Sequence, residues 1–113
     1  MYGTPVASCQ RAPSRHGPRV KLPTEGMPHH PQIVALTDGS IVAAWDEALA
    51  GKRRAVVARA PATNGSAPRF TRAVVGGTDG DVYPVIAAAG GGAVAAWVAN
   101  RGAGSVIAVS RLP

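Results

Sequence analysis

The hydrophobic positions of this chain fall in short runs that are separated by clusters of turn residues such as Gly, Pro, Asp and Asn. Within the runs at residues 33–36, 41–45 and 86–97, apolar residues and glycines occupy consecutive positions, with no alternation of apolar and polar residues. This pattern is typical of strands in a sheet that is covered on both faces. A helix over 86–97 would hold Gly90, Gly91 and Gly92 in its middle, at about 1 kcal/mol each relative to Ala. We therefore predict strands joined by tight turns.

One pattern of apolar runs and turns occurs twice. The segment Pro31–Trp45 reads PQIVALTDGSIVAAW, and the segment Pro84–Trp97 reads PVIAAAGGGAVAAW. The two prolines are 53 positions apart and the two tryptophans 52 positions apart, so one deletion in the turn accounts for the difference. Each copy continues with a turn and a second apolar run that ends in an arginine. A period of this size indicates a solenoid, a propeller or an array.

The first unit is predicted to contain four strands, and the second unit restarts the same cycle. After the second strand we predict a polar loop over Asp46–Lys52, in which the neighbouring acids Asp46 and Glu47 form a solvated turn. The predicted fold class is all-β, built from antiparallel four-stranded repeats. The strands predicted in the first unit are Gln32–Leu36, Ile41–Trp45, Arg54–Arg59 and Phe70–Val75.

The repeat unit resembles one blade of the sialidase-like β-propellers, the BNR or Asp-box repeat proteins. The resemblance rests on Pro-x-Ile, then Asp-Gly-x-Ile-x-x-x-Trp, then a turn and a Val-rich strand that ends in Arg. The Asp-box itself is degenerate, because residues 60–70 keep its Gly and its aromatic residue but lack its Ser and Asp. The resemblance implies a partial propeller of about two blades, over residues 31–76 and 84–112. It also makes Arg19–Leu22 the last strand of a preceding blade.

About two blades are too few to close a ring, because propellers need roughly four to eight. Three explanations stay open for residues 17–113. The chain is a piece of a larger propeller, or it assembles with copies of itself to complete one, or its sheets pack as a small sandwich without a ring.

Composition and charge exclude several classes of protein. The chain has 12 basic and 6 acidic residues, and residues 1–22 hold four of the basic ones and no acid. We predict a flexible basic leader at residues 1–16 and do not expect nucleic acid as a partner. The lone Cys9 excludes a disulfide framework, and no apolar run approaches the roughly 20 residues of a membrane helix. The start is too short for a signal peptide, although the family resemblance favours an extracellular or envelope location.

The resemblance also predicts a ligand face. In propellers the loop before the first strand of a blade and the loop after its second strand commonly share the face around the central channel. Here those loops supply polar and aromatic side chains that suit a glycan or protein ligand. The candidates are His29, His30, Asp46, Glu47, Arg53, Asp81, Tyr83 and Arg101, with Lys52 and Asn100 beside them.

Catalytic roles are not assigned to these residues. Sialidases use an arginine triad, a Tyr nucleophile paired with Glu, and an Asp acid/base. The residues of matching type here are Arg53, Arg54, Tyr83 and Glu47. Tyr83, however, occupies the position of the repeat that His30 holds in the first unit. This indicates a position of the repeat rather than a unique nucleophile. Neighbouring carboxylates in an extended chain point to opposite sides, so Asp46 and Glu47 need not share a substrate.

We expect no metal site and no cofactor. His29 and His30 are adjacent, and adjacent histidines rarely bind one ion. A third ligand would have to come from Asp46, Glu47 or Asp81. The sequence therefore favours a non-catalytic propeller segment, either structural or a binding surface for glycan or protein. The alternative is a fragment of a glycoside hydrolase whose catalytic residues lie in missing blades.

Overall fold

The computed structural model describes residues 19–75, 79–101 and 104–112. Within these residues the chain forms seven strands in two antiparallel sheets and contains no helix, so the predicted all-β fold is confirmed. The leader predicted at residues 1–16 lies outside the described residues. The strands are β1 (Met27–Ala35), β2 (Ile41–Leu49), β3 (Lys52–Ala60), β4 (Thr71–Val75), β5 (Val82–Ala89), β6 (Gly92–Arg101) and β7 (Gly104–Leu112).

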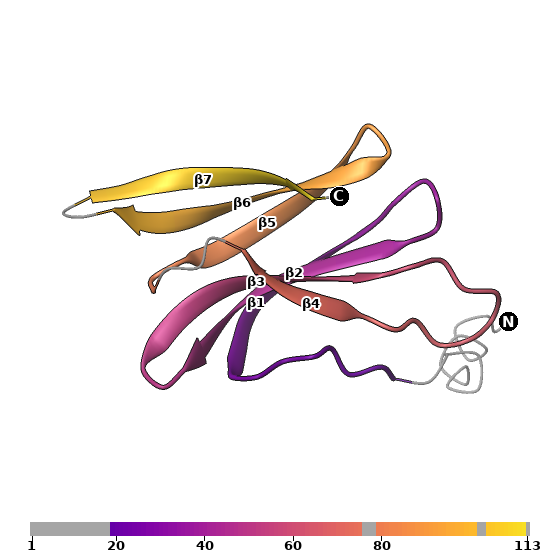
Figure 1. The fold of residues 1–113 in the computed structure, drawn as a ribbon, viewed down its shortest axis with the longest axis horizontal. Coiled ribbons are helices and arrows are strands. Elements are labelled where there is room, and N and C mark those ends of the chain that lie inside the picture. The colour runs from indigo at the N-terminus through magenta and orange to yellow at the C-terminus, as the bar shows by residue number, and fades with distance from the viewer. Residues whose placement is uncertain (1–18, 76–78, 102–103, 113) are drawn as a thin grey trace, which may run out of the picture.

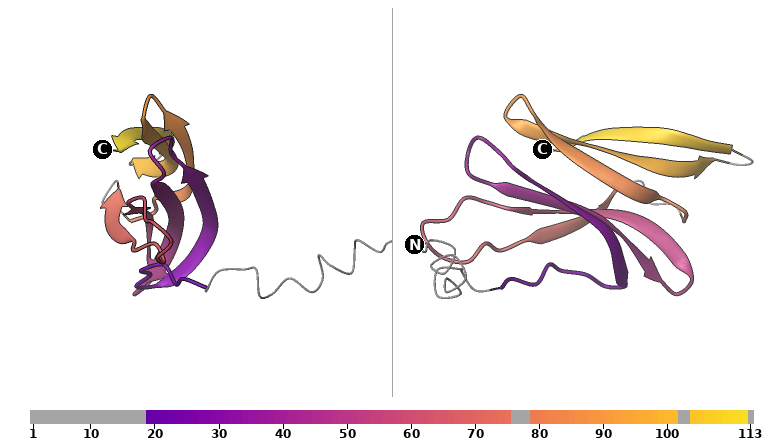
Figure 2. Two further views of the ribbon diagram at one scale, coloured as in Figure 1. Left: turned by 90° about the vertical axis from the view of Figure 1, so that its right-hand side faces the viewer. Right: turned by 180° about the vertical axis from the view of Figure 1, so that it is seen from behind.

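The two sheets lie face to face. Sheet A contains β1 to β4 in chain order, and sheet B contains β5 to β7 in chain order. Figure 1 shows sheet B over one face of sheet A, and the indigo segment that precedes β1 running under the opposite face. The views in Figure 2 show the same layers from the edge and from behind. Arg19–Leu22, the predicted strand of a preceding blade, belongs to neither sheet of the described chain.

The sequence repeat is also a repeat of strand register. In sheet A, Trp45 of β2 pairs with Val56 of β3. In sheet B, Trp97 of β6 pairs with Ala108 of β7. Trp97 and Ala108 each lie 52 positions after Trp45 and Val56. The two hairpins therefore place equivalent residues on equivalent faces of their sheets.

The hairpin between β2 and β3 is longer and tighter than the sequence suggested. Instead of a loop over Asp46–Lys52, β2 continues to Leu49 and a two-residue turn of Ala50 and Gly51 leads into β3. Both turn residues have positive φ, 53° and 78°, which is the geometry of a type I′ turn that matches the twist of paired strands. The prediction of a solvated turn at Asp46 and Glu47 is therefore wrong, since both carboxylates are buried within β2.

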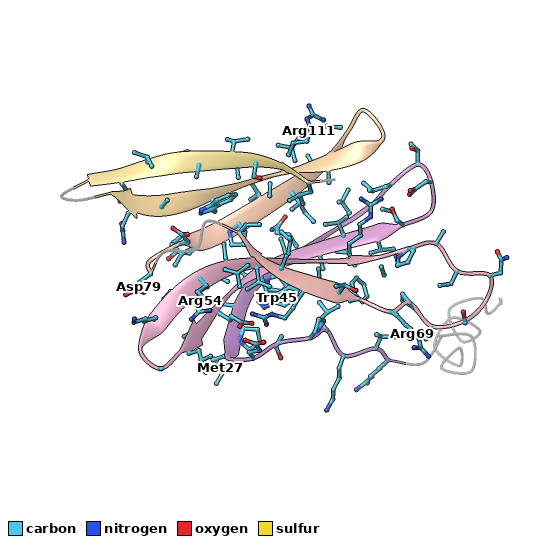
Figure 3. All side chains as sticks on the ribbon, in the orientation of Figure 1. Met27, Trp45, Arg54, Arg69, Asp79 and Arg111 are labelled. Carbon is cyan, nitrogen blue, oxygen red and sulfur yellow. The ribbon has the colours of Figure 1, made fainter. Side chains whose placement is uncertain are left out.

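The core between the sheets consists mainly of Ala and Val side chains, with Trp97 and the larger Leu36, Ile86 and Leu112. Trp97 of sheet B packs there against Ala44, Ala55 and Val57 of sheet A. Such small residues let two sheets approach closely, as the Ala-rich runs indicated. Trp45 points to the other side of sheet A, where it lies in a cluster with Leu22 and Phe70 among its neighbours, and Figure 3 labels it above the segment that precedes β1.

The prediction that the sheets are covered on both faces holds for sheet A only. The six residues Val42–Glu47 of β2 are all buried, because sheet B covers one side and residues of the segment before β1 cover the other. Sheet B buries the side that faces sheet A, while the opposite side exposes large apolar residues such as Ile107 and Val109. Nothing in the described residues covers that side.

Candidate functional site

Asp46 is the centre of a polar cluster where the two sheets meet. It lies on β2 facing sheet B, and its side chain is fully buried. Nδ1 of His30, on β1, lies 2.9 Å from Oδ2, and the guanidinium of Arg53, on β3, donates to Oδ1. The main-chain N–H of Tyr83, on β5, donates to Oδ2 at 3.0 Å. The Asp46 carboxylate on β2 is thus linked to β1 and β3 of its own sheet and to β5 of sheet B.

These contacts fix the charge of Asp46. Burial alone would raise the pKa of this carboxyl, but the hydrogen bonds from Arg53, Tyr83 and His30 outweigh it and hold the pKa below its ordinary value. The group is therefore ionised at neutral pH. Its oxygens already accept three hydrogen bonds, and Nδ1 of His29 lies 3.8 Å from Oδ1. Such a carboxylate orients its neighbours and is poorly suited to deliver a proton.

Two equivalent bulges bring aromatic rings together over this carboxylate. The pairing of β1 with β2 shifts register between His29 and Gln32, and the pairing of β5 with β6 shifts between Val82 and Val85. Inside the bulges, His30 and Tyr83 hold the same repeat position and have positive φ values of 55° and 57°.

Positive φ is uncommon for residues with a side chain and concentrates at functional sites. The rings of His30 and Tyr83 lie 4.6 Å apart between centroids, tilted by 54°, and both side chains are about half exposed. The His29 ring lies 5.9 Å from that of His30. The bulges therefore present a small aromatic surface beside a cation.

Arg53 connects this surface to the loop before β5. Its main-chain N–H donates to Oδ1 of Asp79 at 2.9 Å, and its carbonyl accepts from the N–H of Gly80 at the same distance. The side chain is about one-third exposed. Its Nε is buried and has no hydrogen-bond partner among the described residues. The start of β3 is thus fixed at both backbone groups, which holds the guanidinium in place.

Glu47 does not belong to this cluster. It faces the opposite side of sheet A, as expected for adjacent residues of a strand, and accepts from Nε1 of Trp45 at 2.8 Å. Arg72 binds both of its oxygens, at 3.2 and 3.0 Å, and the N–H of Glu25 lies 3.3 Å from Oε1. Burial would raise the pKa of Glu47, but Arg72, Trp45 and Glu25 together hold it below its ordinary value. This is a buried structural network.

The remaining candidates are placed separately. Asp81 is fully buried just before β5. Arg101 ends β6, and its side chain lies outside the described residues. Of the predicted ligand face, the structure thus brings together His29, His30, Asp46, Arg53 and Tyr83, and it separates Glu47 from them.

No group of three or more potential metal-ligating residues occurs in the described part of the chain. In the same residues, no helix is long and apolar enough to cross a membrane.

Sequence reasoning missed Arg72 and the bulges. Arg72 is 25 positions from Glu47, and no local pattern connects them. A signal for the bulges was present, because His30 and Tyr83 both directly precede a proline in the repeat.

Comparison with protein-family models, curated proteins and solved structures finds no match to this chain. The functional argument therefore depends on the geometry of its own residues.

Proposed function

We propose that this chain is a pair of propeller-like blades of the sialidase-like type, and that it binds a glycan without catalysing its cleavage. The observation that carries this proposal is the exposed surface of His29, His30 and Tyr83 beside Arg53, built on the buried and fully engaged Asp46. Aromatic faces pack against the apolar side of a sugar ring. The guanidinium supplies several fixed donors for hydroxyl or carboxylate oxygens.

The arrangement of carboxylates supports binding over hydrolysis. Most glycoside hydrolases place two carboxyl groups on either side of the scissile bond. Here Asp46 is occupied by protein donors, and Glu47 lies on the other face of sheet A. Tyr83 and Glu47 also do not form the pair of nucleophile and partner that sialidases use. Tyr83 lies on the Asp46 side of sheet A, and Glu47 lies on the other side.

The test is binding of 3′-sialyllactose and of lactose to the purified chain, followed by NMR chemical shifts. We expect binding in the wild type and its loss in Tyr83→Ala and in Arg53→Gln. Ile33→Ala is the matched control, because Ile33 is exposed on the opposite face of sheet A and should leave binding unchanged. If Arg53 binds the carboxylate of the sugar, Arg53→Gln will weaken the binding of 3′-sialyllactose more than the binding of lactose.

Two outcomes would contradict this proposal. If the chain binds neither of the two sugars and no member of a broad glycan array, glycan binding is excluded. Turnover of a fluorogenic sialoside by the wild type would instead favour the alternative, a glycoside hydrolase fragment.

A further inference from the structure

Sheet B has three strands where sheet A has four. In sheet A, β4 pairs antiparallel with β3 and places Ala73 opposite Val57. β7 is the repeat equivalent of β3, and no strand of the described residues pairs with its other edge. The repeat therefore indicates one strand position, beside β7, that is filled in sheet A and open in sheet B.

The main chain of β7 has hydrogen-bonding groups at this open edge. In an antiparallel sheet, the N–H and C=O groups of alternate residues point to opposite sides of a strand. Arg53 of β3 turns both groups away from β2, toward Asp79 and Gly80. Val57, which lies an even number of positions further along β3, turns its groups the same way, toward β4. By the shared register, the residues of β7 whose main-chain groups point to the open edge are Ile107, Val109 and Arg111.

A groove lies beside this edge, between β7 and β4. Its volume is about 310 Å³, and its wall on the side of sheet A is mostly apolar, with Val57, Ala73 and Val75 among its residues. Ser110 and Leu112 of β7 belong to the other wall. The two sheets meet mainly through β5, which lies against β1, β2 and β3, and they leave this space between β4 and β7. An open strand edge beside an apolar groove is the arrangement that binds extended peptides by strand addition.

The equivalent strand β4 indicates which side chains the added strand needs toward sheet A. Residues opposite Ser110 and Ala108 face the groove, because directly paired residues share one face of a sheet. In sheet A the position equivalent to the one opposite Ser110 is held by Arg72, whose guanidinium binds Glu47. Ala99 stands where sheet A has Glu47, so a cation at this position would be buried without its acid. The two residues that face the groove must therefore be apolar.

The charges at one end of the groove favour an acidic residue in the added strand. Arg111 of β7 and Arg59 of β3 line this end, and no acidic side chain lines the groove in the part of the chain that the structure describes. An acidic residue directly opposite Arg111 would form a cross-strand pair of opposite charge. Because the added strand runs antiparallel to β7, this acidic residue is the first of the strand.

We propose that the edge of β7 binds an extended peptide segment of another protein, which begins with an acidic residue and has apolar residues at its second and fourth positions. Its five residues lie opposite Arg111 to Ile107. The first, third and fifth residues lie on the outer face of sheet B, which is the side away from sheet A, beside Ile107 and Val109. A second copy paired edge to edge would place its own four-stranded sheet where β4 lies, so the position suits a single segment. This inference goes beyond the proposed glycan binding, since Tyr83 and Arg53 lie at the junction of β5 with sheet A.

The experiment measures binding of the peptide acetyl-Glu-Val-Thr-Val-Thr, with a fluorophore at its C-terminus, to the whole chain by fluorescence anisotropy. In the proposed pairing, the first, third and fifth residues of the peptide direct their N–H groups at β7, and the second and fourth direct theirs away from it. N-methylation of the third residue should weaken binding at least about tenfold, because it removes a hydrogen bond and places a methyl group against β7. N-methylation of the fourth residue is the matched control and should leave binding nearly unchanged.

Variants of the chain locate the bound peptide. Ala73→Phe should fill the groove and weaken binding at least about tenfold, and Val74→Phe is its matched control on the opposite face of β4. Arg111→Glu should weaken this peptide about two- to tenfold and strengthen a peptide that begins with Lys by a similar factor. Circular dichroism checks that each variant is folded. If Ala73→Phe is not, Val109→Pro replaces it, because proline removes the N–H at the open edge and is tolerated in edge strands.

Three results would overturn the proposal. The first is a peptide that does not bind the wild type at any concentration up to its solubility. The second is equal binding by the two N-methylated peptides, or equal binding of the peptide by Ala73→Phe and Val74→Phe, which would mean that the peptide binds elsewhere. The third is a dimer of the chain in light scattering that Val109→Pro dissociates, which would mean that a second copy occupies the edge of β7.

Discussion

The two tryptophans occupy equivalent positions but have different hydrogen-bond partners. Nε1 of Trp45 donates to Glu47 at 2.8 Å. Nε1 of Trp97 is buried and has no acceptor among the described residues, because Ala99 stands where sheet A has Glu47. The same substitution, Trp to Phe, should therefore have unequal effects at the two positions.

The size of the difference follows from the two contacts. Trp45→Phe removes a hydrogen bond to a charged acceptor, which contributes about 1.5–3 kcal/mol. Trp97→Phe removes a buried donor without an acceptor, which costs the folded state about 1–3 kcal/mol. Both side chains are buried, with 1% and 5% exposed, so the loss of apolar contact is similar in the two variants. Trp45→Phe should be the less stable variant by at least about 2.5 kcal/mol.

Urea unfolding followed by circular dichroism measures this difference directly. The variants should show the same dependence on urea concentration and different midpoints. In thermal unfolding, Trp45→Phe should melt at least about 10 °C below Trp97→Phe. Equal destabilisation of the two variants, or a larger loss for Trp97→Phe, would refute the assignment of these partners.

Three further predictions concern stability. The folded-state pKa values of Asp46 and Glu47 are lowered, so the stability that the two ionised carboxylates provide is complete above their unfolded-state pKa values of about 4 and is lost as pH falls through their folded-state pKa values. Asp46→Asn and Glu47→Gln should therefore each reduce the fall of the melting temperature in acid. Arg72→Met should cost about 3–5 kcal/mol in urea unfolding by leaving Glu47 buried without its cation, and Arg72→Met with Glu47→Leu should recover only part of the loss, because Nε1 of Trp45 then lacks its acceptor. Gly26→Ala should cost about 2 kcal/mol or more, because the added carbon would lie 2.2 Å from a main-chain oxygen of β2, whereas Gly104→Ala meets no atom and should be nearly neutral.

The strands were predictable because their signals are local. Apolar runs and the turn at Asp38 and Gly39 define the first hairpin, and the structure shows the turn closed by hydrogen bonds between Leu36 and Ser40 and between Gly39 and Leu36. The repeated Val-Ala-Ala-Trp motif predicted equivalent strands, and the shared register bears this out. Neither feature needs information from distant parts of the chain.

The end of β2 was not predictable for the opposite reason. Asp46 and Glu47 look like a solvated loop, and only distant partners make their burial favourable. Tyr83, 37 positions away, supplies an N–H to Asp46, and Arg72, 25 positions away, supplies a guanidinium to Glu47. Burying a charge without such partners would be strongly unfavourable. A single sequence does not reveal these pairs, so the carboxylates were assigned to solvent.

The relation between repeat and site follows from these placements. The apolar residues of the central strands are repeated, since the same packing problem occurs twice in the chain. The polar cluster occupies positions where the two units differ, so it forms at one junction and cannot form again on the outer face of sheet B. The junction between the sheets inside the chain is therefore the place where this polar cluster forms. The differing positions are Asp46 and Val98, Glu47 and Ala99, Arg53 and Ser105, and His30 and Tyr83.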